Sequence, residues 1–202
     1  TPNPLTPALK LQRRREGEIN METMNKNIAV NTNPEEIKKL IWQILETVSD
    51  PEVPVLSVID LGVVRNVEVI PTPPSVGWEV SVFVTPTYTG CPAMDVMKMN
   101  IRMALLQEGF TDIKIIQVLS PAWTTDWMTE QGKEKLKAYG IAPPNYKQAV
   151  CTPDSFQEAE AVQCPLCNSY HTKLVSQFGS TACKALYQCN DCKEPFDYFK
   201  CH

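Results

Sequence analysis

The hydrophobic positions between residues 34 and 48 recur at intervals of three and four, which is the spacing of one face of an α-helix. The residues that share this face are Ile37, Leu40, Ile41, Ile44, Leu45 and Val48. Asn33 is a favourable N-cap residue, Pro34 suits the first helical position, and Glu36 stands where a capping box requires an acidic residue. The pattern therefore predicts a helix whose first residue is Pro34.

Alternation with a period of two follows in three later segments, as expected for β-strands. The segments are VVRNVEVI at residues 63–70, WEVSVFVT at residues 78–85 and DIKIIQVL at residues 112–119. In the second segment one face carries Trp78, Val80, Val82 and Val84. The stretch PTPPSVG between the first two segments predicts a turn, so we expect three strands in this part of the chain.

Two further helices are predicted, one on each side of the third strand. The segment 93–108 has apolar side chains at helical spacing, namely Met94, Met97, Ile101 and Leu105. The segment 127–139 predicts a shorter helix, against which Trp123 and Trp127 are expected to pack. The order helix, two strands, helix, strand, helix predicts a small α+β domain whose three-stranded sheet is covered by helices.

Composition divides the chain into four parts. Residues 1–32 begin with a stretch of few apolar residues and no periodicity, which predicts a disordered N-terminal tail. The α+β domain is expected over residues 33–144, and an acidic linker follows at residues 145–162. Residues 163–202 form a cysteine-rich module.

Four cysteines of this module form two C-x-x-C pairs, Cys164 with Cys167 and Cys189 with Cys192. A C-x-x-C turn directs two thiolates at one metal ion, and two such turns complete a tetrahedral site. A module of this size buries too little apolar surface to fold alone, so we expect the metal to supply folding energy. Zinc is the expected ion, and rubredoxin-like iron is the alternative because the same ligands bind it.

Charge and composition narrow the function classes. The chain has 202 residues, a net charge of −4 and eight cysteines. Proteins that bind nucleic acid usually carry a basic surplus, which this chain lacks, so no nucleic acid is expected as a partner. No apolar run approaches the roughly 18 residues of a membrane span, and no secretory signal pattern is present, so we expect a cytoplasmic protein without a membrane partner. In that compartment cysteines serve as metal ligands and free thiols rather than in disulfides.

Cys91 is the candidate functional thiol. It lies in TPTYTGCPAMD, residues 85–95, after the second strand and before the long helix. With Pro92 at the first helical position, Cys91 is expected at the N-cap, where unpaired N–H groups and the helix dipole favour a thiolate. Hydroxyl groups are expected nearby from Thr85, Thr87, Tyr88 and Thr89.

Two acidic residues, Glu52 and Asp60, lie in a proline-rich loop that is able to fold over the same site. One thiolate with one or two carboxylates is an incomplete ligand set, which suits transient capture of iron or of an iron–sulfur cluster. In the alternative interpretation Cys91 only caps the helix and Asp60 only ties down its own loop. Cys183, in the C-terminal module, is either a small buried residue or a second functional thiol that faces the first domain.

Four longer strings carry a family resemblance. The first three, SDPEVPVLSVIDLGVV, TPTYTGCPAMD and SPAWTTDWMTEQGKEKLKAYGIAPP, resemble the iron–sulfur-assembly domain shared by SufT and the cytosolic iron–sulfur targeting factors. With the fourth, FGSTACKALYQCNDCKEPFDYFKCH, residues 34–202 resemble the PaaD (PaaJ) family of bacterial phenylacetate degradation.

This resemblance implies an accessory factor of the multicomponent phenylacetyl-CoA epoxidase, not the enzyme that performs the epoxidation. Such a factor would assemble or deliver iron or iron–sulfur clusters. Its implied partners are the di-iron oxygenase, the iron–sulfur flavin reductase and general iron–sulfur assembly proteins. Two alternatives stay open: a non-catalytic scaffold subunit of the oxygenase complex, and an electron-transfer protein whose ribbon carries rubredoxin-like iron.

Overall fold

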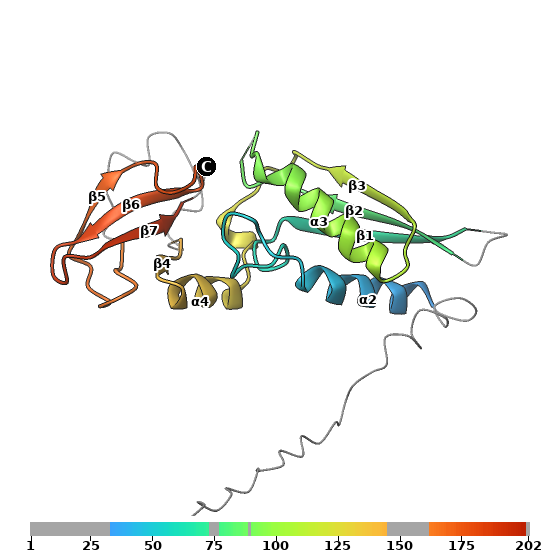
Figure 1. Ribbon diagram of the computed structural model, residues 1–202, viewed down its shortest axis with the longest axis horizontal. Coiled ribbons are helices and arrows are strands. Elements are labelled where there is room, and N and C mark those ends of the chain that lie inside the picture. Colours follow the sequence, from blue (N-terminus) through green and yellow to red (C-terminus); the bar gives the residue numbers. More distant parts are fainter. Residues whose placement is uncertain (1–32, 73–76, 89, 145–161, 201–202) are drawn as a thin grey trace, which may run out of the picture.

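The computed structural model describes residues 33–72, 77–88, 90–144 and 162–200. The predicted disordered tail at residues 1–32 and nearly all of the predicted linker lie outside the described residues, as do Cys151, Cys201 and His202. The described chain forms two modules that lie side by side, each built around its own sheet (Figure 1).

Helix α2, Pro34–Glu46, confirms the first predicted helix. Asn33 is its N-cap, and the Asn33 side chain accepts a hydrogen bond from the backbone N–H of Glu35 at 3.2 Å. In the expected capping box the side chain of Asn33 would accept the backbone N–H of Glu36. That N–H donates instead to the backbone carbonyl of Asn33 at 2.9 Å. The buried residues of α2 are Ile37, Ile41, Ile44 and Leu45.

The first sheet has three strands in the order β1 (Val64–Pro71), β2 (Trp78–Val84) and β3 (Asp112–Gln117). Strands β1 and β2 are antiparallel, whereas β2 and β3 are parallel and are joined through helix α3, Ala93–Gln107. One face of the sheet is apolar because residues in register, such as Val67 with Val82, point the same way. Helices α2 and α3 pack against the sheet and against each other, which confirms the predicted α+β fold (Figure 1).

The last helix of this domain is shorter than predicted. Instead of one helix over residues 127–139, a 3₁₀ turn at Thr125–Trp127 precedes helix α4, Glu130–Ala138. Thr129 causes the interruption because it is the N-cap of α4, and its hydroxyl accepts the N–H of Gly132 at 2.9 Å. A capping residue has extended backbone angles, so a helix cannot continue through it.

The second sheet belongs to the C-terminal ribbon and has the strand order β4-β7-β6-β5. Its strands are β4 (Ile141–Ala142), β5 (Thr172–Ser176), β6 (Lys184–Cys189) and β7 (Pro195–Phe199). Strand β4 directly follows α4 and pairs in parallel with β7. The polypeptide thus enters the ribbon sheet before it reaches the predicted linker.

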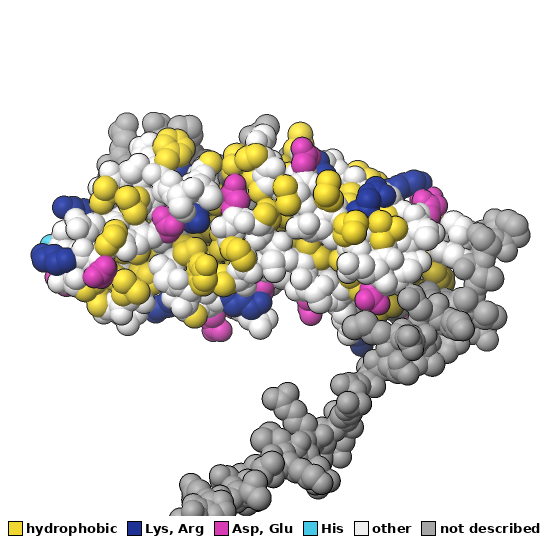
Figure 2. Space-filling model, viewed as in Figure 1, with side chains coloured by type: hydrophobic (Ala, Val, Ile, Leu, Met, Phe, Trp, Pro, Cys, Tyr) yellow, Lys and Arg dark blue, Asp and Glu magenta, His cyan; other side chains and the backbone are white. Residues whose placement is uncertain are grey.

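The two modules share part of one core. Cys183 and Phe199 of the ribbon belong to the same buried cluster as the valines of the first sheet. Trp123 lies between the modules, where its indole Nε1 donates a hydrogen bond to the carbonyl of Leu61 at 2.9 Å. The ribbon is therefore packed onto the first domain, and the space-filling view shows the two in continuous contact (Figure 2).

Candidate metal centre and module junction

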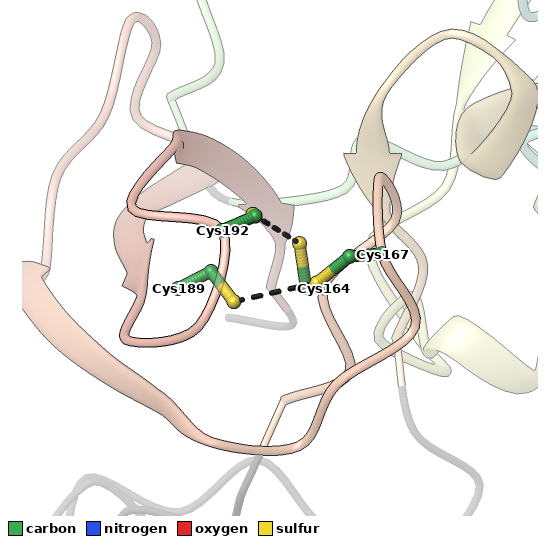
Figure 3. A group of neighbouring side chains, drawn as sticks. All are labelled: Cys164, Cys167, Cys189 and Cys192. Atoms are coloured by element: carbon green, nitrogen blue, oxygen red, sulfur yellow. Dashed lines mark hydrogen bonds between the residues drawn. The ribbon is translucent and has the colours of Figure 1, made fainter.

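The four cysteines of the C-x-x-C pairs converge on one point of the ribbon (Figure 3). All four sulfur atoms lie within 4.8 Å of one another. The Sγ atoms of Cys164 and Cys192 are 3.8 Å apart, and those of Cys167 and Cys189 are 3.5 Å apart. Two thiolates bound to one tetrahedral ion at about 2.3 Å each would be separated by about 3.8 Å. The donor set therefore fits a single tetrahedral metal ion.

Local backbone geometry directs these cysteines toward one another. In the first turn the carbonyl of Cys164 accepts the N–H of Asn168 at 2.9 Å, and Asn168 has a positive φ of 61°. In the second turn the N–H of Cys189 donates to the carbonyl of Glu194 at 3.0 Å, and Lys193 has a positive φ of 68°. Each C-x-x-C pair is thus followed by a residue in the left-handed conformation, which closes the turn.

The turns also supply hydrogen-bond donors to the sulfur atoms. Burial acts to raise the pKa of Cys189, but the backbone N–H groups of Cys192 and Asp191 and the neighbouring thiols lower it to about 7. At Cys192 a backbone hydrogen bond from Glu194 acts to lower the pKa, but burial and the neighbouring thiols raise it to about 12. Cys189 therefore gives up its proton to a metal ion more readily than Cys192 does.

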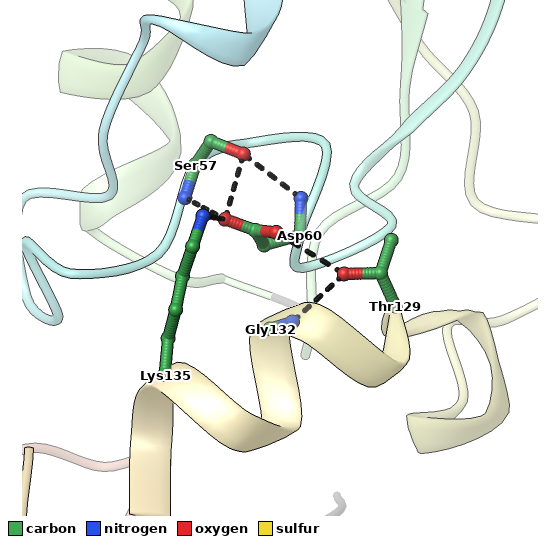
Figure 4. A network of polar contacts seen from close by, with 5 residues as sticks. All are labelled: Ser57, Asp60, Thr129, Gly132 and Lys135. Carbon is green, nitrogen blue, oxygen red and sulfur yellow. Dashed lines mark hydrogen bonds and ion pairs between the residues drawn. The ribbon is translucent and has the colours of Figure 1, made fainter. Parts of the chain in front are cut away.

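Asp60 is buried between its own loop and helix α4, and both of its carboxylate oxygens accept hydrogen bonds there (Figure 4). Its Oδ2 accepts hydrogen bonds from the N–H and the hydroxyl of Ser57, both at 3.0 Å, and from Lys135 Nζ at 2.6 Å. Its Oδ1 accepts from the hydroxyl of Thr129 at 3.1 Å. Burial acts to raise the pKa of Asp60, but Lys135, Ser57 and Thr129 together lower it. These contacts favour the interpretation that Asp60 ties its loop to α4.

Cys91 lies at the start of α3, but one residue earlier than predicted. The N-cap of α3 is Pro92, which makes no side-chain capping hydrogen bond. Pro92 has the helical angles φ −68° and ψ −25°, while the N–H of Cys91 donates to the carbonyl of Tyr88 at 3.3 Å. The N-cap prediction for Cys91 was therefore wrong, because a turn from Tyr88 to Cys91 precedes the helix. The Cys91 thiol is free and partly buried.

Tyr88 marks the place where three segments of the chain meet. Its pKa is raised well above the ordinary tyrosine value, first by burial and next by a hydrogen bond with the side chain of Cys91. Electrostatic interactions with Cys91, Glu52 and Cys183 raise it further. Glu52 comes from the loop after α2, Cys91 from the loop before α3, and Cys183 from the residue before β6. We call Glu52, Tyr88, Cys91 and Cys183 the junction site.

Cys183 is buried and contacts the first domain, so the position expected in both interpretations is observed, while a functional role of its thiol stays a prediction. Its Sγ donates a hydrogen bond to Glu52 Oε2 at 3.4 Å and lies 3.0 Å from the hydroxyl of Thr181. Burial is the main cause that raises the pKa of the Cys183 thiol to about 12, although Thr181 acts in the opposite direction. Cys183 therefore carries its proton at neutral pH and donates it to the Glu52 carboxylate.

The position of Glu52 is set by a turn that Asp50 stabilises. Asp50 Oδ1 accepts the backbone N–H of Glu52 at 2.8 Å and that of Val53 at 2.6 Å.

The junction site is less compact than the four-cysteine centre, since among the described residues only the four cysteines bring three or more ligand atoms within 4.8 Å of one another. Sequence reasoning named Tyr88 only as one of several nearby hydroxyl groups and gave no signal for its central place.

Two family models match this chain, one in each module. Residues 38–114 match a family model described as iron–sulfur cluster assembly protein, and residues 148–200 match the PaaD zinc beta ribbon domain. The chain is 50% identical over 163 residues to an Escherichia coli K12 protein named as a putative subunit of 1,2-phenylacetyl-CoA epoxidase. The match spans 80% of this chain and 91% of the E. coli protein. The chain belongs to the PaaD family.

Among solved structures, this PaaD-family chain is similar to a domain of unknown function from Bacillus anthracis, with 24% identity and a TM-score of 0.45 over 51% of this chain and 93% of that one. It is also similar to a Mycobacterium tuberculosis protein described as associated with [Fe-S] complex assembly and repair. That match has 33% identity and a TM-score of 0.33, and covers 55% of this chain and 92% of the other. Within its described residues, no helix has the length and apolarity needed to cross a membrane.

Proposed function

We propose that this PaaD-family chain is an accessory factor of a phenylacetyl-CoA epoxidase system, and that it assembles or delivers iron or iron–sulfur clusters without catalysing the epoxidation. The 50% identity to a protein named as an epoxidase component supports the pathway, and the family match over residues 38–114 supports the role in cluster assembly. The observation that carries the proposal is the position of Cys91, a free and partly buried thiol inside the matched segment and beside Tyr88.

The chemistry of the junction site suits a carrier. Cys91 and Glu52 offer one soft and one hard ligand to a metal, and the remaining coordination positions stay open. A carrier needs such open positions because a donor must deliver its iron to the site and an acceptor must take it away. A closed four-ligand site such as the ribbon cysteines retains its ion instead.

We assign zinc to the four ribbon cysteines, where it stabilises the fold. Two of the ligands, Cys164 and Cys189, are themselves part of the small apolar cluster at the centre of the ribbon. The ion therefore takes the place that apolar side chains hold in a larger domain. The electron-transfer alternative requires iron at this site, and the visible spectrum separates the two because ferric tetrathiolate is red and zinc is colourless.

The decisive experiment deletes the gene and measures the iron and cluster content of each epoxidase component purified from the deletion strain. We expect the oxygenase or the reductase to lack metal while its polypeptide accumulates normally. Fully metallated components in the deletion strain would exclude the maturation role and would leave the scaffold role.

A scaffold role is the second candidate, and helix α3 supports it. Four of its apolar side chains, Val96, Met99, Met103 and Leu106, are between 41% and 66% exposed, and they recur at helical spacing. Of the methionines of this helix, only Met94 and Met97 are buried in the core. Hydrophobic side chains gather over α3 in the space-filling view (Figure 2). Such a stripe is typical of a surface that binds another protein.

The two roles predict opposite results for two variants. A scaffold should lose its binding to the epoxidase complex when Met99 and Met103 are replaced by glutamate, and should tolerate Cys91→Ser. A maturation factor should fail in epoxidase metallation with Cys91→Ser even when it still binds the complex. Affinity purification of the complex and iron analysis of its components measure both effects.

A further inference from the structure

The contact between Cys183 and Glu52 joins the two modules with the geometry of a metal chelate. The Sγ and Oε2 atoms are 3.4 Å apart. A tetrahedral ion that binds a thiolate at about 2.3 Å and a carboxylate oxygen at about 2.1 Å would hold these atoms about 3.6 Å apart. The two donors are therefore spaced to bind one ion with little movement of either side chain.

The two donors of this pair differ in their exposure. Cys183 is 5% exposed and is enclosed by the ribbon and the first domain. Glu52, Tyr88 and Cys91 are partly exposed and lie on the first-domain side. The Thr181 hydroxyl, 3.0 Å from the Cys183 sulfur, is placed to donate a hydrogen bond to a thiolate there. Cys183 is therefore the buried donor of the pair, and Glu52 is the more accessible one.

We infer that Glu52 and Cys183 form a binding site for a single ferrous ion, and that Cys91, which lies on the far side of Tyr88 from this pair, is the exchange ligand that a small movement brings to the ion. This inference rests on the proposed role in iron supply and assigns the ribbon a direct part in that role. A mixed thiolate and carboxylate pair suits Fe²⁺, which is intermediate between the soft ions that thiolates prefer and the hard ions that carboxylates prefer.

The binding step is a ligand exchange without electron transfer. Fe²⁺ loses two water ligands and gains one Fe–S bond to Cys183 and one Fe–O bond to Glu52. The S–H proton that Cys183 shares with Glu52 leaves to solvent, and the iron stays ferrous. Water occupies the remaining positions until Cys91 or an acceptor protein replaces it.

Zinc-loaded full-length protein, kept anaerobic, provides the test. Co²⁺ is titrated first because thiolate ligation gives it charge-transfer absorption in the near ultraviolet, and Fe²⁺ affinity is then measured by competition with a chelator. We expect one equivalent of either ion to bind in addition to the zinc. Cys183→Ser and Glu52→Gln should each weaken Fe²⁺ binding at least about tenfold. Mutating even a residue that only hydrogen-bonds to a metal ligand lowers metal affinity by about this factor, and a lost ligand should cost no less.

The variants separate a metal site from a purely structural contact. Serine at position 183 can still donate a hydrogen bond to Glu52, and glutamine at position 52 can still accept one, so both keep the link between the modules. Glu46→Gln, at an exposed glutamate of α2, is the matched control and should bind Fe²⁺ as the parent does.

Parental Fe²⁺ affinity in Cys183→Ser, or no uptake of metal beyond zinc by the parent, would overturn the inference. If Cys183→Ser fails to fold, parental affinity in Glu52→Gln overturns it equally. Either result would leave the maturation role untouched, because that role is decided by the metal content of the epoxidase components in the deletion strain.

Discussion

Trp123 of the first domain packs edge-on against Phe199 of the ribbon, with ring centroids 6.3 Å apart and planes inclined at 69°. Both side chains are buried, and both belong to the core of the first domain. The end of strand β7 is thus held in that core, and Cys183 lies next to it because its carbonyl accepts the N–H of Lys200 at 3.1 Å. The aromatic contact therefore helps to place Cys183 against Glu52.

Phe199→Ala should destabilise the protein strongly. Phe199 is 2% exposed, and removal of a buried phenylalanine side chain costs about 3 kcal/mol or more. Zinc content should stay normal because the cluster around the four cysteines does not include Phe199. Chemical denaturation and zinc analysis measure both effects. The control is Phe178→Ala, a ribbon residue that is 64% exposed, and an equal loss in that variant would contradict the account.

Cys189→Ser should remove the metal and unfold residues 160–202. Serine is a poor ligand at neutral pH, and the ribbon cluster around the metal is too small to fold by itself. Limited proteolysis should then cut within the ribbon, whereas Cys151→Ser should retain one metal ion and resist cleavage. A ribbon of Cys189→Ser that stays protected without metal would show that docking onto the first domain is enough to fold it.

Asp60→Asn should lower the free energy of unfolding by about 2 kcal/mol, since it weakens a buried carboxylate's charged hydrogen bonds. Asp95→Asn is the matched control, because the side chain of Asp95 is 93% exposed and pairs with Lys98 on the surface of α3. Its effect should be within about 0.5 kcal/mol. A similar loss in both variants would contradict the structural role of Asp60.

The loss of stability caused by Asp60→Asn should also depend on pH. The pKa of Asp60 is lowered in the folded protein, so the charged form contributes stability that is fully present above the unfolded-state value of 3.8. This contribution is lost as the pH falls through the folded-state pKa, where the carboxylate takes up a proton. The stability difference between parent and Asp60→Asn should therefore shrink below that window, as denaturation curves at a series of acidic pH values would show.

Cys91→Ser and Cys91→Ala should both fold with nearly parental stability. Neither change alters the N-cap residue of α3, which is Pro92. Both variants should nevertheless fail to restore epoxidase metallation in a deletion strain, since neither side chain replaces a thiolate as a ligand for iron. Thermal unfolding and iron analysis of the epoxidase components test the two statements. Full restoration of metallation by Cys91→Ser would show that Cys91 has only a structural role in its turn.

The sequence by itself determined those features that depend on near neighbours in the chain. The alternation in the strands and the inward face of α3 follow from the hydrophobic period of a single segment. The Asn33 cap follows from a residue type that favours the N-cap and stands directly before Pro34. The four-cysteine centre was also predictable, because C-x-x-C turns bring their thiols together through local backbone geometry. The N-cap of α3 was misplaced by one residue because the turn from Tyr88 to Cys91 depends on a backbone hydrogen bond that no residue pattern signals.

Only the tertiary structure decided which candidate ligands meet. Asp60 lies 75 positions before Lys135, and the two side chains meet in an ion pair that joins the loop to α4. Glu52 and Cys183 are 131 positions apart and meet because the ribbon packs into the core of the first domain. Contacts between residues so far apart in the sequence arise because apolar surfaces of the two modules are buried against each other. Polar side chains that meet as a result show no periodic pattern in the sequence, so the sequence does not predict which of them pair.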